Sequence, residues 1–568
     1  MEIPNDKSFA FVHNEQWIKI LDITKYKNKR TFPVLQLFVF LSLFQAFPLF
    51  SRNVQPLKGI YDGKIGNDEV ILVAESTDSV FLKGYFVLNR GKAVEMSHTF
   101  LLNNAGPKPV FQSDLYLGTL TKAQSDSTSF DGTLTLLNKR RRFFFWRPKA
   151  TLHLVRRPEL KVVPSDRYQK EVFSTVETKS DILYGKAKGY WTNSPYTDEA
   201  YINVLSKGLI KSFKDPQLLD LNLDIYYPKG DFFKNRPLVM LIHGGAFYIG
   251  SKESAAEKTL ATTLAKRGYV VASIDYRLGF KMLASDIEMS GYRAIQDAHA
   301  ALRFLAHNAK GLGINPQQIY VGGTSAGGVA SLNVAFLDND KLPGPIKQAI
   351  KDGTATKIEA SGNKYTEGFQ IKGVANMWGA VSDLNIITKD KKIPVLSIHG
   401  TADDIVPYGY DYPFQNLVMI NRLVTDKMYG SKPIHDQLQI LGIRNRLVTL
   451  NGLGHEPELE TATSLNHYMD TITTQVARFF YEETAPQISL PASQLKVSET
   501  ADQKPVFYEV NNGDPVQVSV QGGVKTKSDP KDATVIWFSN SNDRKLIIQA
   551  TNPFDAWISQ AFPVTLVK

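Results

Sequence analysis

The 568-residue chain contains no cysteine. This absence excludes disulfide bonds, thiol nucleophiles and thiolate metal ligands, and it removes the lipid-bearing cysteine that a bacterial lipoprotein needs. The fold must therefore be stable by packing alone, and we expect neither a metal nor another cofactor. Disorder is also not indicated, because 43% of the residues are hydrophobic and 21% are charged, which is an ordinary globular composition.

A strong charge of one sign is also missing. The chain has 66 Lys and Arg against 56 Asp and Glu, and a net charge of +10 on this length is typical of a solvated surface. One basic run, residues 139–142, leads directly into the aromatic run 143–146. Because no nucleic-acid-binding motif accompanies it, this pattern favours an apolar strand beside a charged turn. We expect no nucleic acid among the partners, and the sequence does not indicate an oligomeric state.

An uncharged stretch rich in Phe and Leu lies between Arg30 and Arg52. Basic residues from Lys25 to Arg30 precede it, and a basic segment followed by an apolar block is typical of an export signal. The block is also long enough to span a bilayer, so residues 31–51 could instead act as a membrane anchor, or they could be a buried or artefactual segment. Our first prediction is an exported protein, periplasmic, secreted or at the cell surface.

The chain divides into four parts with different patterns. Residues 1–54 form the signal or anchor region, and short alternating strands over 55–158 predict an antiparallel domain, either a small barrel or a sandwich. Over 166–484 buried strands alternate with helices, which is typical of a mostly parallel, doubly wound α/β sheet. Short strands return over 486–568 and predict a C-terminal β-sandwich. We therefore expect an α/β domain flanked by N-terminal and C-terminal all-β domains.

The strongest chemical signal is the segment from Gly323 to Gly327, which fits the pattern G-x-S-x-G. It follows an apolar strand and precedes a helix, which is the context that this pattern requires. Such a turn holds a serine above the carboxyl edge of the sheet, near the following amide and the helix N-terminus. Ser325 is therefore the predicted nucleophile.

A serine nucleophile needs an imidazole base and a carboxylate that orients it. Asp403 follows the apolar segment 393–398 and is the predicted acid, with Asp404 as the near alternative and Asp383 as a more distant one. His455 lies in a Gly-flanked loop before the last helix of the α/β part and is the predicted base. The order serine, acid, histidine is the order found in this class of enzyme.

A second glycine-rich segment, residues 243–247, ends a strand upstream of the serine. Glycines at such a position allow backbone amides to face the negative charge that develops on a substrate carbonyl oxygen. The predicted donors are the amides of Gly245, Ala246 and Ala326. His243 precedes the serine in the chain, so we interpret it as a residue that shapes this loop.

These segments together resemble the α/β-hydrolase carboxylesterases. The resemblance rests on HGGAF (243–247), SIDYR (273–277), QDAHAALRFL (296–305), INPQQIYVGGTSAGG (314–328), HGTADDIVP (399–407) and GLGHEP (452–457). It covers roughly residues 201–483 and is strongest to bacterial acetyl- and feruloyl-esterase-like enzymes, with a weaker likeness to hormone-sensitive-lipase-like esterases. It implies ester hydrolysis through an acyl-enzyme on Ser325, and structural roles for Asp275 and Asp297.

The substrate is less well defined by the sequence. Phe247, Tyr248 and Trp378 are candidates for the pocket wall, although each could equally belong to the core. The polar segment 337–370 is either a small lid or a surface insertion. A short acyl or aryl-acyl ester, as a small molecule or linked to a polysaccharide, is the expected substrate.

Two other functions fit parts of the sequence. An exopeptidase or acylaminoacyl hydrolase would use the same catalytic centre, but such enzymes usually carry an aromatic residue after the serine, where this chain has Ala326, and a propeller domain. A binding protein on an inactive hydrolase scaffold would usually have lost the serine or the histidine.

Overall fold

The computed structural model describes most of the chain beyond residue 58. The described residues are 59–76, 81–90, 93–94, 98–103, 110–113, 116–122, 129–136, 149–156, 165–195, 207–208, 211–212, 214–281, 283–416, 421, 426–461, 463–498, 506–510, 516–528, 532–537 and 543–567. No helix within them is long and apolar enough to cross a membrane. The segment 31–51, on which the prediction of a signal or anchor rests, lies outside the described residues.

The N-terminal strands form one antiparallel sheet that closes on itself. Its order is β2-β1-β9-β8-β7-β6-β5-β3-β4, and β2 also pairs with β3, so the sheet has the form of a small barrel. The strands are β1 (Gly59–Ile65), β2 (Asp68–Ser76), β3 (Phe81–Arg90), β4 (Ala93–Val94), β5 (His98–Asn103), β6 (Val110–Ser113), β7 (Tyr116–Lys122), β8 (Ser129–Leu136) and β9 (Lys149–Arg156).

The central part of the chain is built on an eight-stranded sheet in the order β10-β11-β13-β12-β14-β15-β16-β19. The strands are β10 (Val176–Gly189), β11 (Gln217–Pro228), β12 (Arg236–Ile242), β13 (Val270–Ile274), β14 (Ile314–Thr324), β15 (Ile371–Met377), β16 (Val395–Gly400) and β19 (Asn445–Leu450). The pairings β10–β11 and β11–β13 are antiparallel, and all later ones are parallel. This is the mostly parallel sheet that the sequence predicts.

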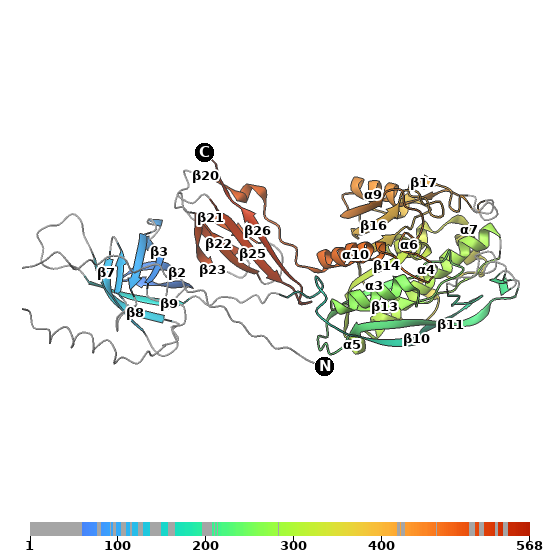
Figure 1. Cartoon of the computed structure of the whole chain (residues 1–568), viewed down its shortest axis with the longest axis horizontal. Helices are drawn as coiled ribbons and strands as arrows, with labels where there is room; N and C mark the ends of the chain where they lie inside the picture. Colours follow the sequence, from blue (N-terminus) through green and yellow to red (C-terminus); the bar gives the residue numbers. More distant parts are fainter. Residues whose placement is uncertain are drawn as a thin grey trace, which may run out of the picture.

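Helices cover both faces of this sheet (Figure 1). They are α3 (Ala255–Lys266), α4 (Ala284–His307), α5 (Ala309–Leu312), α6 (Ala326–Phe336), α7 (Gly344–Lys351), α9 (Ser431–Ile440) and α10 (Tyr468–Thr484), with short 3₁₀ helices η1 (Asn339–Lys341), η2 (Ile358–Ala360) and η3 (Leu384–Ile386). Leu238 and Met240 of β12 pack into one core cluster with α4 and α6, whereas Val239 and Leu241 pack into another with α3 and α10. Alternate residues of a strand face opposite sides, so the sheet is doubly wound.

The C-terminal part consists of two three-stranded sheets, β21-β24-β23 and β22-β25-β26, and a short pair, β20-β27. After η4 (Ala492–Leu495), the strands are β20 (Lys496–Ser498), β21 (Val506–Glu509), β22 (Val516–Gln521), β23 (Gly523–Ser528), β24 (Asp532–Trp537), β25 (Lys545–Thr551), β26 (Trp557–Pro563) and β27 (Thr565–Val567). Side chains from both three-stranded sheets share one core cluster, as in a sandwich. An α/β domain with all-β parts on either side is therefore confirmed.

The loop between β25 and β26 contacts the central domain. The hydroxyl of Tyr168 donates to the carbonyl of Phe554 at 2.9 Å, and that of Tyr481, on α10, donates to the carbonyl of Trp557 at 2.7 Å. Ala556 is fully buried in the same core cluster as α3 and α10. This loop is thus part of the packing of the central domain.

Candidate functional site

The candidate site lies where three parallel strands end. Ser325 follows β14, Asp403 lies three residues after β16, and His455 lies five residues after β19. Strands β14, β15, β16 and β19 are neighbours in that order and run in the same direction. Their carboxyl ends therefore share one edge of the sheet, where open α/β sheets bind ligands.

Ser325 sits on a strained turn between β14 and α6. Its φ is 52° and its ψ is −118°, a backbone conformation that a residue with a Cβ atom rarely adopts. Only glycine fits at the two flanking positions, because a side chain would clash with the backbone there. A Cβ atom on Gly323 would lie 2.4 Å from the carbonyl oxygen of Ile242, and one on Gly327 would lie 1.9 Å from it. The amide of Ser325 donates to the carbonyl of Met377, on β15, at 2.9 Å, which fixes the turn against the next strand.

The three predicted side chains meet in a continuous hydrogen-bonded chain. Ser325 Oγ lies 2.8 Å from His455 Nε2, and His455 Nδ1 lies 2.8 Å from Asp403 Oδ2. Ser325 is 4% exposed and Asp403 is 6% exposed, whereas the His455 side chain retains 12% exposure. In this arrangement the imidazole can accept the serine proton while the carboxylate holds its other nitrogen.

Asp403 is held as a carboxylate by several donors. Its Oδ1 accepts the amides of Ile405 and Val406, both at 2.9 Å, and its Oδ2 also lies 3.1 Å from Nε2 of the buried His399. Burial alone would raise the pKa of Asp403, but the hydrogen bonds from His399 and His455 outweigh burial and hold that pKa well below its usual range. The carboxylate is therefore ionised whenever the imidazole needs an acceptor.

The alternative acids lie elsewhere. The side chain of Asp404 is directed to Asn416, and Asp383 is exposed and accepts the amide of Asn385. His243 is fully buried, and its ring stacks on Tyr276 at 4.3 Å. Burial lowers the pKa of His243 to about 4, so this histidine is neutral at ordinary pH and lies inside the loop, as the sequence interpretation expects.

The loops that carry the acid and the histidine are joined through their backbones. The amide of Ala402 donates to the carbonyl of Leu453 at 2.9 Å. A Cβ atom on Gly400 would lie 2.3 Å from the same carbonyl oxygen, so only glycine allows this approach. The separation of Asp403 and His455 is thus fixed by main-chain contacts between the two loops.

The glycine-rich loop after β12 adopts left-handed conformations at three successive residues. The φ values are 99° at Gly245, 52° at Ala246 and 59° at Phe247, which is costly for the two residues that carry a Cβ atom. Gly244 lies against Ser325, since a Cβ atom there would be 3.3 Å from Ser325 Cβ. Within the part of the chain that the structure describes, the amides of Gly245, Ala246 and Ala326 donate to no backbone acceptor.

Two of the three aromatic residues predicted for the pocket wall are core residues. Tyr248 is 1% exposed and packs against Trp191 and Phe280, with ring centroids 5.1 and 4.8 Å away. Trp378 is fully buried in the core cluster that contains α3 and α10. Both are therefore corrected to core positions, because these side chains have no free surface for a substrate. Phe247 is half-buried beside α4 and stays a candidate.

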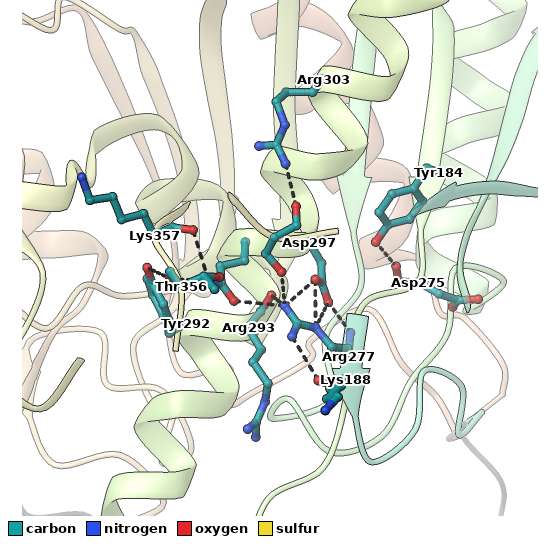
Figure 2. Close-up of polar contacts among 12 residues, drawn as sticks. Tyr184, Lys188, Asp275, Arg277, Tyr292, Arg293, Asp297, Arg303, Thr356 and Lys357 are labelled. Carbon is teal, nitrogen blue, oxygen red and sulfur yellow. Dashed lines mark hydrogen bonds and ion pairs between the residues drawn. The ribbon is translucent and has the colours of Figure 1, made fainter. Parts of the chain in front are cut away.

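The segment 337–370 is bound to the flank of the domain. Arg277 forms a bidentate ion pair with Asp297, on α4, and also donates to Ser361 Oγ at 3.1 Å (Figure 2). Arg303, also on α4, donates to the carbonyl of Ser361 at 2.7 Å. Of the two sequence hypotheses, these contacts favour a surface insertion over a lid. They also give Asp297 the structural position that the resemblance implies.

The sequence does not reveal a buried carboxyl behind Ser325. Glu257, on α3, is 2% exposed, and its Oε1 accepts a 2.7 Å hydrogen bond from the hydroxyl of Thr324. Burial raises the pKa of Glu257 to about 7. No sequence signal marks this residue, because a glutamate in the first turn of a helix is usually solvated. Among the described residues no group of three or more His, Asp or Glu side chains is arranged to hold a metal ion.

Comparisons with known proteins agree with this architecture. Residues 223–379 match the family model described as BD-FAE. Gut esterase 1 of Caenorhabditis elegans is 36% identical over 109 residues, 19% of this chain and 19% of that protein. A protein of Oryza sativa subsp. japonica named "Probable isoprenylcysteine alpha-carbonyl methylesterase ICME" is 30% identical over 196 residues, 33% of this chain and 42% of that protein.

Solved structures include one named "Truncated form of carbohydrate esterase from gut microbiota", which is 21% identical and covers 55% of this chain and 98% of its own, with a TM-score of 0.33. The chain spans about a fifth of the length of the first curated relatives it matches. The strand order, the serine turn and the family match all concern the same central region. The central part of this chain has the α/β-hydrolase fold, and residues 223–379 within it are similar to the BD-FAE family.

Proposed function

We propose that the central domain hydrolyses carboxylic esters through an acyl-enzyme on Ser325. The observation that carries this proposal is the chain of two 2.8 Å contacts from Ser325 through His455 to Asp403. Ser325 attacks the ester carbonyl while His455 takes the hydroxyl proton through Nε2. His455 then returns that proton to the leaving alcohol, and a water activated by the same imidazole releases the acyl group.

The proposed oxyanion donors are the amides of Gly245, Ala246 and Ala326. Support comes from the absence of backbone acceptors for these amides among the described residues, and from the contact of Gly244 with Ser325. The N-terminus of α6, which begins at Ala326, adds a favourable dipole for negative charge. Each such donor contributes on the order of 10²–10³ in kcat.

The acyl group is proposed to be short or aryl, and the alcohol to be a carbohydrate. Ala246 places a methyl group where many relatives of the resembled family have a third glycine, and half-buried Phe247 follows it. Together they narrow the space beside the nucleophile, which disfavours long acyl chains. A series of p-nitrophenyl esters from acetyl to palmitoyl, together with methyl ferulate, tests this: kcat/KM should fall steeply beyond short chains.

The enzyme proposal is tested by covalent labelling. A fluorophosphonate probe should label the full chain, and Ser325→Ala should abolish labelling and ester turnover together. Labelling without ester turnover but with hydrolysis of amino-acid anilides would favour the exopeptidase alternative. Neither labelling nor turnover would favour a binding protein. Export is proposed for the chain as well, and would be tested by fractionating cells that express it with and without residues 25–51.

A further inference from the structure

An exposed aromatic ribbon lies beside the acid loop and has no role in the chemistry proposed above. It consists of β17 (Tyr410–Asp411) and β18 (Met428–Tyr429), an antiparallel pair in which Tyr410 faces Tyr429. Tyr412 and Lys427 each lie two residues from these tyrosines in the sequence, and Lys427 Nζ lies 5.2 Å from the Tyr412 ring centroid. Since side chains alternate along a strand, these four side chains share one face of the ribbon. We call this set the tyrosine face.

The tyrosine face is open to solvent. Tyr410 is 53% exposed and Tyr412 is 41% exposed. The rings of Tyr410 and Tyr429 are stacked, with centroids 4.3 Å apart, and Lys427 Nζ lies 5.4 and 5.2 Å from the ring centroids of Tyr410 and Tyr412. Single exposed aromatic residues are common, but a preorganised cluster with polar groups at its rim marks a binding surface.

Two connections fix the ribbon at the edge of the sheet that carries Ser325. Tyr429 exchanges backbone hydrogen bonds of 2.8 and 2.9 Å with Val381. Val381 is four residues beyond Met377, whose carbonyl accepts the amide of Ser325. Four residues of chain span at most about 14 Å between Cα atoms, so the ribbon is anchored within one substrate length of the nucleophile turn.

The second connection runs through the acid loop. Tyr410 follows Asp403 by seven residues, and the intervening Tyr408 places its ring edge-on to His399 with centroids 5.7 Å apart. His399 in turn contacts Asp403. The ribbon therefore lies on the Asp403–His455 side of the nucleophile. Because His455 must reach the oxygen of the leaving alcohol to protonate it, the alcohol portion of an ester occupies this side.

We propose that the tyrosine face binds a neutral pyranose unit in the alcohol portion of the substrate. This inference rests on the proposed ester hydrolysis and names its substrate class. A pyranose ring has a face of C–H bonds that packs on an aromatic ring, and hydroxyl groups at its rim that bond to polar neighbours. Lys427 supplies such a group, and its ion pair of 3.6 Å with Asp411 balances its charge, so the surface does not require an ionic ligand.

The test compares substrates that share an acetyl group and differ only in the alcohol: acetylated xylotriose, phenyl acetate and ethyl acetate. In Tyr410→Ala and Tyr412→Ala, KM for the sugar ester should rise on the order of tenfold, the loss of roughly one stacking contact, while ethyl acetate turnover stays within about twofold. Tyr410→Phe should retain sugar-ester activity. Phe232→Ala is the matched control, since Phe232 is 87% exposed and precedes β12. It therefore lies near the amino ends of the parallel strands, whereas Ser325 lies at their carboxyl ends.

An equal loss of activity on all three esters would mean that the substitutions only disturb the acid loop, and this result would overturn the inference. Loss confined to phenyl acetate would assign the ribbon to aryl alcohols and overturn it as well. Should the wild type cleave ethyl acetate and reject the sugar ester, the inference fails while the proposed function stands. If no ester is cleaved, xylotriose is titrated into the full chain and binding is measured by calorimetry. Binding that is weakened in Tyr410→Ala would support the inference, and absence of binding would overturn it.

Discussion

The hydroxyl of Thr324 donates a 2.7 Å hydrogen bond to the carboxyl of Glu257, which is 2% exposed. Thr324 directly precedes Ser325, so this contact ties the serine turn to α3, the helix that follows the glycine-rich loop. Among the described residues no cation forms an ion pair with Glu257. A buried carboxyl without such a partner is more stable with its proton than without it.

The first prediction concerns this proton. Burial raises the pKa of Glu257 to about 7 in the folded protein, from an ordinary value of 4.5. Between pH 4.5 and 7 the folded protein therefore keeps a proton on Glu257 that the unfolded chain has released. Glu257 contributes its full share to the free energy of unfolding below pH 4.5, and this contribution is lost as the pH rises through 7. Between pH 4.5 and 8, the free energy of unfolding should fall by about 3 kcal/mol more in the wild type than in Glu257→Gln.

Urea unfolding of both proteins at several pH values measures that difference. Asp275 and Glu483 are also buried acids with pKa values raised to about 7 by burial, but they titrate in both proteins and cancel in the comparison. A difference between the two proteins that does not change with pH would show that Glu257 is ionised in the folded state.

The second prediction separates the two neighbouring aspartates. Asp403→Asn removes the acceptor of His455 Nδ1 and should lower kcat by about 10⁴-fold with little change in KM, since the imidazole loses its orienting carboxylate. Asp404→Asn alters only a contact with Asn416 and should leave kcat within about threefold. Steady-state kinetics on a p-nitrophenyl ester compares them, and comparable losses in both variants would contradict the assignment.

Some features of the candidate site could be predicted from the sequence, and others could not. The serine turn was predictable because glycines at 323 and 327 leave a visible pattern, and their physical cause is the backbone of Ile242. The choice between Asp403 and Asp404 depends on which side chain reaches His455, and a sequence register only favours one. Glu257 and Tyr248 were hidden for another reason: burial of one helical glutamate or one loop tyrosine depends on tertiary contacts that no local pattern records.

A third prediction tests the close approach of backbone atoms at the serine turn. A methyl group on Gly327 would lie 1.9 Å from the carbonyl oxygen of Ile242, and backbone cannot yield as a flexible side chain can. Gly327→Ala should therefore cost about 3 kcal/mol or more of stability. Gly344→Ala is the control, because a Cβ atom there meets nothing within 4 Å. Thermal denaturation reports both, and equal melting temperatures would refute the steric argument.

The last prediction concerns the loop between β25 and β26. Ala556 belongs to the C-terminal part of the chain, yet it is fully buried among residues of α3 and α10. A charge at this position would be buried without a partner, so Ala556→Asp should destabilise the central domain by several kcal/mol, on the order of 3–5. Ala561→Asp, on the exposed face of β26, introduces the same side chain without burial and should have little effect.

Unfolding in urea, followed through loss of ester turnover, measures the central domain specifically. If the loop is part of that domain's packing, Ala556→Asp shifts the midpoint of activity loss to lower urea, while Ala561→Asp leaves it unchanged. A midpoint shift seen only by tryptophan fluorescence, with activity loss unaltered, would mean that the C-terminal sandwich unfolds by itself. In that case the hydrogen bonds from Tyr168 and Tyr481 to this loop would position the sandwich without contributing to the stability of the central domain.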